Sequence, residues 1–185
     1  MATGPRKCHQ SAPKKLSSLC HPCWNLAKMR IELAANIGRR FHTSLREAGE
    51  REIGGMLLAE QLKPGHFCII DFSVDSFSGS HTGFRRDPQA HQNALDEFFR
   101  RTGRDFQRFN YLGEWHSHPS FSVHPSTQDI NTMTEIVENQ SSLITFAVLL
   151  IVRLRFRIWV EHSLTVFARD QAPQPSRISR RVVWI

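Results

Sequence analysis

The segment from Gly113 to Asp129 constrains this chain most, because it puts three metal-ligating side chains on one strand and one helix. Its sequence is GEWHSHPSFSVHPSTQD. His116 and His118 are two residues apart, so on an extended strand both imidazoles point to the same face. Ser126 and Asp129 are three residues apart, which brings both side chains onto the first turn of a helix. Two histidines and a carboxylate are a common ligand set for a catalytic zinc with one open position.

A purely structural interpretation of the same residues stands beside the metal site. Ser126-x-x-Asp129 has the spacing of a helix capping box, and His-x-His also occurs at solvated strand ends. The spacing alone therefore leaves both alternatives open.

Length and composition indicate one globular domain. The chain has 185 residues, 40% of them hydrophobic, with 13 Phe, which is enough for a genuine core. Four cysteines at uneven spacing do not form a disulfide scaffold and suit a reducing compartment. We expect a cytoplasmic protein, because the sequence shows neither an apolar run of transmembrane length nor the apolar segment of a signal peptide.

The net charge of +7 is concentrated in the tails. Residues 1–30 contain six basic and no acidic residues, and residues 169–185 contain four Arg and one Asp, which leaves −2 for the body between them. This distribution argues against a nucleic-acid-binding domain and favours solvated basic extensions.

Periodicity predicts an α/β fold of the α+β type, with one mixed, mostly antiparallel sheet flanked by helices. The predicted helices span residues 31–48, 88–101 and 126–139. The predicted strands span residues 53–59, 67–77, 109–116, 143–152, 154–161 and 163–169. In the strand over 154–161 the arginines at 153, 155 and 157 alternate with apolar residues, which predicts a solvent-facing row of arginines.

Three regions are predicted along the chain. Residues 1–28 lack periodicity and are expected to be a flexible basic extension, in which Cys20 and Cys23 form an isolated CxxC that lacks a second pair of ligands. Residues 29–170 form the domain. Residues 171–185 are a Pro- and Arg-rich tail whose apolar end, Val182 to Ile185, could dock on the core.

A hydrolytic metal site needs a proton acceptor that is not itself a ligand. Glu47, Glu50, Glu52 and Glu60 are all candidates. Glu52 is the best placed of them, because it immediately precedes a buried strand that can hold it in place.

The two halves of this pattern together resemble the JAMM motif of the JAB/MPN metalloproteases. Glu52 is followed by IGGMLL, and His116-x-His118 by seven residues, Ser126, two residues and Asp129. The resemblance covers residues 31–168, and FRRDP at 84–88, the helix with HQ at 91–92 and YLGEW at 111–115 resemble the bacterial branch. The resemblance implies a JAB1/MPN-like, cytidine-deaminase-like domain.

The resemblance also implies a zinc peptidase. His116, His118 and Asp129 would bind one Zn²⁺ with a water in the fourth position. Glu52 would take the proton of this water and pass it to the leaving amine, and Ser126 would hydrogen-bond the oxyanion. The substrates implied are isopeptide or peptide bonds after the C-terminal tail of a ubiquitin-like protein, whose tail could dock by adding a strand to an open sheet edge.

Bacterial relatives of this kind often lie beside ubiquitin-like conjugation enzymes, including those of antiphage (CBASS) systems. The implied partners are therefore a ubiquitin-like protein, a nucleotidyltransferase, and activating and conjugating enzymes of the same operon. Alternative functions are processing of a sulfur-carrier protein, a non-catalytic MPN scaffold and a RadC-like DNA-associated domain. Substrate choice is expected to lie in the loops Ser78–Asp87 and Phe121–Pro125.

Two further aromatic positions in the motif have simpler interpretations. His124 could be a spare ligand or a substrate contact, but an exposed loop histidine is the simpler prediction. Trp115 lies between motif residues and points away from His116 on the strand, which predicts core packing.

Overall fold

The computed structural model describes residues 25–75, 79–80, 83–84 and 88–179. The CxxC of Cys20 and Cys23 and the apolar end from Val182 to Ile185 lie outside these residues, as does most of the predicted extension 1–28. None of the helices in the described part of the chain is long and apolar enough to cross a bilayer.

The described residues form a mixed sheet and three α-helices, as the sequence predicted. The helices are α1 (Ile37–Ala48), α2 (Pro88–Arg101) and α3 (Thr127–Glu138), with one 3₁₀ turn, η1 (Leu26–Lys28). The strands are β1 (Arg30–Leu33), β2 (Gly54–Lys63), β3 (His66–Phe72), β4 (Gly79–Ser80), β5 (Gly83–Phe84), β6 (Phe109–Ser117), β7 (Phe146–Arg155), β8 (Trp159–Ala168), β9 (Gln174–Ser176) and β10 (Ile178–Ser179).

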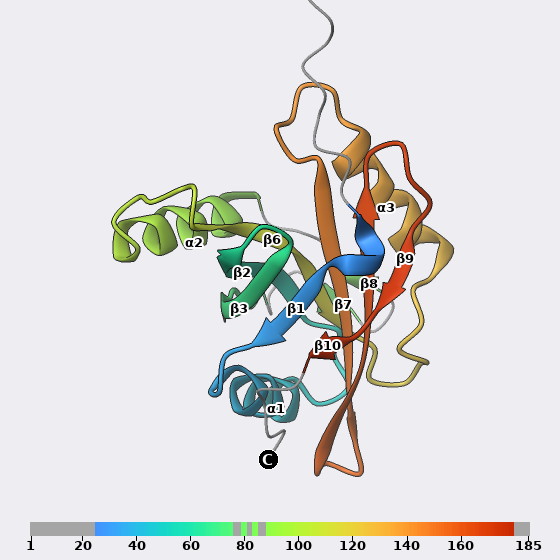
Figure 1. The fold of residues 1–185 in the computed structure, drawn as a ribbon. Coiled ribbons are helices and arrows are strands. Elements are labelled where there is room, and N and C mark those ends of the chain that lie inside the picture. The colour runs from blue at the N-terminus through green and yellow to red at the C-terminus, as the bar shows by residue number, and fades with distance from the viewer. Residues whose placement is uncertain (1–24, 76–78, 81–82, 85–87, 180–185) are drawn as a thin grey trace, which may run out of the picture.

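Eight of these strands form one sheet in the order β10-β1-β3-β2-β6-β7-β8-β9, and β4 and β5 form a separate pair. The β1–β10, β1–β3 and β6–β7 pairings are parallel, and the other four are antiparallel. The outermost strands β9 and β10 are separated in the chain only by Arg177. The two ends of the sheet therefore come together, and Figure 1 shows β9 and β10 as one continuous red segment between β8 and β1.

Side-chain alternation along β7 divides the core into two layers. Val148, Leu150 and Val152 pack with the apolar face of α1, in a cluster that includes Phe41 and Trp115. Ala147, Leu149 and Ile151 point to the opposite face and pack with Met133 and Val137 of α3. On this second face α2 covers Met56 and Leu58 of β2 through Phe98. A strand buried on both sides needs a continuous apolar run, and residues 146–152 provide one.

The core position predicted for Trp115 is confirmed. Its side chain is fully buried, its ring makes edge contacts with Phe41 and Phe72, and its indole N–H donates a 2.8 Å hydrogen bond to the Ser73 carbonyl. Gly55 is needed beside it, because a Cβ there would lie 2.3 Å from the same carbonyl oxygen.

The helix predicted over 31–48 is wrong in its first turn. Arg30–Leu33 is the strand β1, paired in parallel with β3 and β10, and the helix begins only at Ile37. Ile31 and Leu33 are both fully buried. Their two-residue spacing also fits a strand, and the segment forms a strand because it pairs with β3 and β10, which are distant in the chain.

The prediction of three strands over 143–169 is also wrong, because the structure has two, joined as the hairpin β7–β8. The hairpin turn contains Phe156 and Arg157 with φ of 50° and 59°, which is a left-handed conformation that neither residue type signals in a sequence. Phe156 and Ile158, the apolar residues on either side of Arg157 in the predicted alternation, are exposed in this turn. The solvent-facing row of arginines is wrong for Arg153, whose side chain is only 17% exposed and is paired with Glu161.

The predicted tail 171–185 contributes strands β9 and β10 to the sheet. The domain boundaries at residues 28 and 170 stay predictions.

Candidate metal centre

Two strands and one helix meet where the three predicted ligands lie. His116 is near the end of β6, paired with Gly54 of β2 on one side and Ile151 of β7 on the other. His118 follows β6 and is held in the sheet by a 3.0 Å hydrogen bond from its backbone N–H to the Val152 carbonyl. Asp129 is on the first turn of α3. A single loop, residues 118–125, therefore connects β6 to α3 and brings the three side chains together.

The three side chains converge as the spacing predicted. The Nε2 atoms of His116 and His118 are 3.0 Å apart, and Asp129 Oδ1 is 3.4 Å from His116 Nε2. The Oδ2 atom of Asp129 is 4.0 Å from His118 Nε2. Ligand atoms at about 2.0–2.1 Å from a tetrahedral zinc lie roughly 3.3 Å from one another, so these separations suit the ion. In the described part of the chain this is the one group of three or more His, Cys, Asp or Glu side chains that could hold a metal.

The His118 ring is oriented from its other side. Its Nδ1 lies 2.6 Å from the Ser122 carbonyl oxygen. A carbonyl only accepts, so Nδ1 carries the hydrogen and Nε2 keeps the lone pair that a metal needs. Metal-binding histidines commonly have such an outer partner, which fixes the tautomer and the ring orientation.

Ser126 caps α3 and supports the carboxylate ligand at the same time. The backbone N–H and the hydroxyl of Ser126 both donate to Asp129 Oδ2 at 2.7 Å, and the Asp129 N–H donates to Ser126 Oγ at 3.2 Å. This is a complete capping box. The carboxylate is thereby fixed through Oδ2, which turns Oδ1 toward His116. The capping box is thus present, and the same Asp129 belongs to a group of side chains that could hold a metal.

Glu52 lies beside the ligands although it is more than sixty residues away in the chain. Gly54 pairs with His116, residues 53 and 117 exchange hydrogen bonds, and Glu52 precedes Ile53, so its carboxyl interacts electrostatically with His118 and Asp129. The residue is 8% exposed. Burial raises the pKa of the Glu52 carboxyl above its ordinary value, His118 lowers it, and Asp129 adds to the rise. A buried carboxyl with a raised pKa beside a metal site suits general base catalysis near neutral pH.

Other residues near the candidate ligands have structural contacts or lie outside the group. His124 is exposed and outside the cluster of ligands, which agrees with the simpler prediction of a loop histidine. Glu50, another candidate base, instead accepts a 3.2 Å hydrogen bond from the Ser120 hydroxyl. Sequence reasoning missed the Ser122 carbonyl and the buried Ser117 hydroxyl, which accepts from the Ile53 N–H at 3.0 Å. A backbone carbonyl and a common serine carry no signal in a single sequence.

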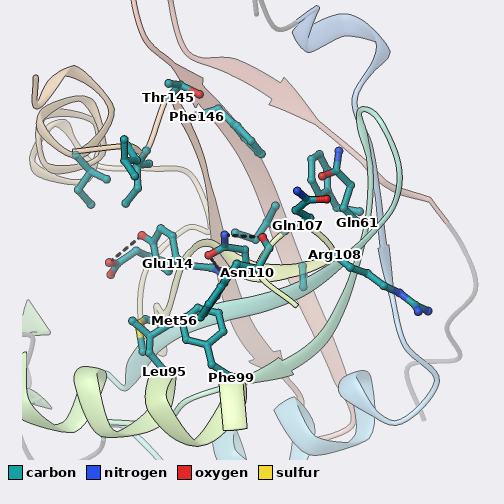
Figure 2. Close-up of a pocket in the computed structure, with 18 residues that line it drawn as sticks. Met56, Gln61, Leu95, Phe99, Gln107, Arg108, Asn110, Glu114, Thr145 and Phe146 are labelled. Carbon is teal, nitrogen blue, oxygen red and sulfur yellow. Dashed lines mark hydrogen bonds between the residues drawn. The ribbon is translucent and has the colours of Figure 1, made fainter. Parts of the chain in front are cut away.

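A separate cavity of about 690 Å³ is lined by residues of β2, β6 and α2 and by the segment Leu143–Phe146. Glu114, two residues before His116 on β6, lines it and accepts a 3.2 Å hydrogen bond from the Tyr111 hydroxyl. Figure 2 shows Leu95 and Phe99 of α2 on one side of the cavity and the Thr145–Phe146 segment on the other. None of the three ligands is among the lining residues, so the metal centre and this cavity are distinct features.

Two solved structures of similar fold illustrate the likeness. A protein from Desulfitobacterium hafniense matches with a TM-score of 0.62 and 18% identity, over 83% of this chain and 92% of that one. A protein from Salinibacter ruber matches with a TM-score of 0.51 and 19% identity, over 80% and 90% of the two chains. At these identities the likeness shows the fold alone. No curated protein sequence matches the chain.

The family comparison covers both halves of the candidate site. The model of the prokaryotic homologs of the JAB domain matches residues 34–164, which is more than half of the 185-residue chain. This range includes Glu52 and all three potential ligands. The chain therefore belongs to the prokaryotic homologs of the JAB domain.

Proposed function

We propose that the protein is a zinc-dependent isopeptidase or peptidase that cleaves after the C-terminal tail of a ubiquitin-like protein or its conjugate. The observation that supports this most is the convergence of His116, His118 and Asp129, with buried Glu52 two residues before the neighbouring strand β2 and in electrostatic contact with His118. A ligand set alone would suit a structural metal, whereas a non-ligand carboxyl beside it is what hydrolysis requires.

The side chains divide the reaction between them. Zinc, when bound by the three ligands, supplies Lewis acidity that activates water and polarises the carbonyl under attack. Glu52 accepts a proton from the attacking water and delivers it to the leaving amine. The raised pKa of Glu52 supports both roles, because a carboxyl that ionises closer to neutral pH takes up and releases a proton more readily under working conditions.

Ser126 has one hydroxyl hydrogen, which it donates to Asp129 Oδ2. Stabilisation of the oxyanion, the role implied by the family resemblance, would require this hydroxyl to turn away from Asp129. The capping box keeps the Ser126 backbone N–H on the carboxylate during such a turn, so Asp129 would stay in place.

Substrate recognition is assigned to the loops beside the metal centre. The separate β4–β5 pair lies within the predicted specificity segment Ser78–Asp87, and each strand of a two-stranded sheet has one edge available for an added strand. An extended C-terminal tail could pair there. The second loop, Phe121–Pro125, contributes Phe121, which is 59% exposed and whose ring lies 6.5 Å from that of His118.

The proposal extends to the setting of the enzyme. We place it in the bacterial cytoplasm, in an antiphage conjugation system whose partners are a nucleotidyltransferase and ubiquitin-activating and conjugating enzymes. Processing of a sulfur-carrier protein would use the same chemistry on another substrate. The near-neutral body of the chain gives no support to DNA binding.

The test is cleavage of a ubiquitin-like protein that carries a C-terminal extension, by zinc-loaded protein. We expect the wild type to cut after the tail, and Glu52→Ala to lose at least about 100-fold in rate while it retains its zinc, measured by mass spectrometry of the native protein. Equal cleavage by Glu52→Ala would rule out the assigned base. A wild type that holds zinc and cleaves nothing, or that purifies without zinc, would point instead to a non-catalytic scaffold.

A further inference from the structure

Three consecutive backbone carbonyls of the loop after β6 are each bound by a side chain. The Phe121 carbonyl accepts a 2.6 Å hydrogen bond from Arg153 Nη1. The Ser122 carbonyl accepts the Nδ1–H of the potential ligand His118, also at 2.6 Å. The Val123 carbonyl accepts the hydroxyl of Ser163. The carbonyl that orients the histidine is therefore flanked on both sides by carbonyls that the β7–β8 hairpin holds.

Both hairpin side chains reach the loop because of the strand register. Ile151 pairs with Ser163, and Arg153 pairs with Glu161, so these four residues share one face of the hairpin. Ile151 packs in the cluster under α3, together with Val123 of the loop. Arg153 lies one repeat further along the strand, where the apolar layer ends and the loop begins.

The Arg153 guanidinium is held by Glu161 as well as by the loop. Its Nη2 and Nε donate to Glu161 Oε2 at 2.6 Å and 3.1 Å, while Nη1 remains for the Phe121 carbonyl. The side chain is 17% exposed, so water competes little for these bonds. By contrast, the loop itself offers little apolar packing around Ser122, because Phe121 and Ser122 are exposed.

We propose that Arg153 and Ser163 are positioning residues for His118. By fixing the Phe121 and Val123 carbonyls they hold the Ser122 carbonyl where it selects the Nδ1–H tautomer, and so keep Nε2 available as the metal ligand. This inference rests on the metal centre of the proposed function, but its test does not depend on catalysis. It assigns a role in supporting the metal to Arg153, one of the row of arginines that the sequence pattern predicted only to face solvent.

The experiment measures zinc affinity, by competition with a chelator, in the full chain. Arg153→Ala should weaken zinc binding by about 10- to 100-fold, the usual effect of losing an outer partner of a metal ligand. Ser163→Ala should weaken it in the same direction. Arg155→Ala is the matched control, since Arg155 lies on the same strand face, 3.9 Å from Glu161 and over the Phe156 ring. It should bind zinc as the wild type does.

A second readout separates positioning from a general loss of stability. In the metal-free protein, ¹⁵N NMR of the histidine side chains should show one His118 tautomer, protonated at Nδ1, in the wild type and in Arg155→Ala. A mixture of tautomers is expected in Arg153→Ala. Arg153→Lys should restore part of the zinc affinity, because its ammonium can still donate to the Phe121 carbonyl. Should Arg153→Ala not fold, Ser163→Ala and Arg153→Lys provide the same comparison.

The outcomes separate this inference from the proposed function. Zinc affinity and tautomer unchanged in Arg153→Ala and Ser163→Ala would overturn the positioning role, whether or not the protein is an enzyme. If the wild type binds zinc but cleaves no substrate, and these variants lose zinc affinity, the positioning role is supported and the isopeptidase function is not. A wild type without zinc affinity would overturn both.

Discussion

At the scale of single residues, the candidate site depends on which atom of each side chain is left for the metal. His118 uses Nδ1 on the Ser122 carbonyl and Asp129 uses Oδ2 on Ser126, so Nε2 and Oδ1 remain. Both of these potential ligands are thus fixed by a partner on the far side. Such outer contacts set metal affinity as much as the identity of the ligand does.

Ser126→Ala should reveal how far the capping box supports the metal. The variant loses the cap, which costs about 1 kcal/mol of stability, and loses one of the two bonds to Asp129 Oδ2. We expect about a 10-fold weaker affinity for zinc together with a lower melting temperature. Chelator competition and thermal unfolding of the metal-free protein measure the two effects. Ser126→Thr, which keeps the hydroxyl, is the control, and unchanged zinc affinity in Ser126→Ala would confine Ser126 to the cap and the oxyanion.

The site residues that depend on short-range spacing in the sequence could be predicted, and those that depend on long-range contacts could not. The sequence named His116, His118, Asp129 and Ser126 from spacing alone, because a strand and a helical turn fix which neighbours share a face. It named Glu52 only with the help of a family resemblance. It did not indicate Arg153 as a contact of the loop, because the residues near Arg153 in the chain carry no information about which segment packs over this side of β7.

At the scale of elements, one carboxylate joins two helices to the sheet. Asp71 of β3 accepts a 2.7 Å hydrogen bond from Arg40 of α1, and its second oxygen accepts one from Arg101 at the end of α2. Burial alone would raise the pKa of Asp71, but the hydrogen bonds from Arg101 and Arg40 and the charge of Arg40 outweigh it and lower the pKa. The Arg40 guanidinium also lies 4.5 Å from the centre of the Phe72 ring.

Asp71→Asn should destabilise the fold in a pH-dependent way. A lowered pKa in the folded state contributes stability that is present above the unfolded value, about 3.9, and is lost as the pH falls through the folded value. We expect the variant to lose about 1–2 kcal/mol at neutral pH and less in acid. Urea unfolding at several pH values measures this. Glu97→Gln, which removes exposed ion pairs with Arg100 and Arg101, should change little at any pH. A pH-independent loss in Asp71→Asn would contradict the argument.

The elements that sequence patterns misjudged are those whose boundaries depend on partners. The short β1 was assigned to a helix, because four residues carry too little periodicity to separate a strand from a first helical turn. The β7–β8 turn was misplaced, because Phe156 and Arg157 occupy left-handed positions that usually belong to Gly or Asn. By contrast, α2 was predicted with both of its ends, since Pro88 marks the beginning and its apolar face is regular.

At the scale of the whole molecule, the segment Gln174–Ser179 closes the sheet. It pairs with β8 through Ser176, Pro175 and Gln174, and with β1 through Ile178 and Ser179. Six residues thus cover both edges of the six-stranded sheet β1-β3-β2-β6-β7-β8. Exposed edges promote association between chains, so covering them reduces association as well as stabilising the fold.

Truncation tests this closure. A chain that ends at Pro173 should melt at a lower temperature than the full chain and associate at high concentration, because both edges are then open. A chain that ends at Ser179 keeps β9 and β10 and serves as the control. Thermal unfolding and light scattering measure stability and association. Equal behaviour of the two truncated chains would show that β9 and β10 contribute nothing to closure.

The sequence by itself determined the chemistry of the candidate site and the class of fold. Ligand identity, ligand spacing and apolar periodicity are local properties, expressed within one strand or one turn of helix. Only the tertiary structure decided that Glu52 lies beside His118, that Arg153 and Ser163 bind the loop, and that residues 174–179 join both edges of the sheet. These contacts join residues that are distant in the chain. They depend on strand register and sheet curvature, which arise when the whole core packs and which no short segment encodes.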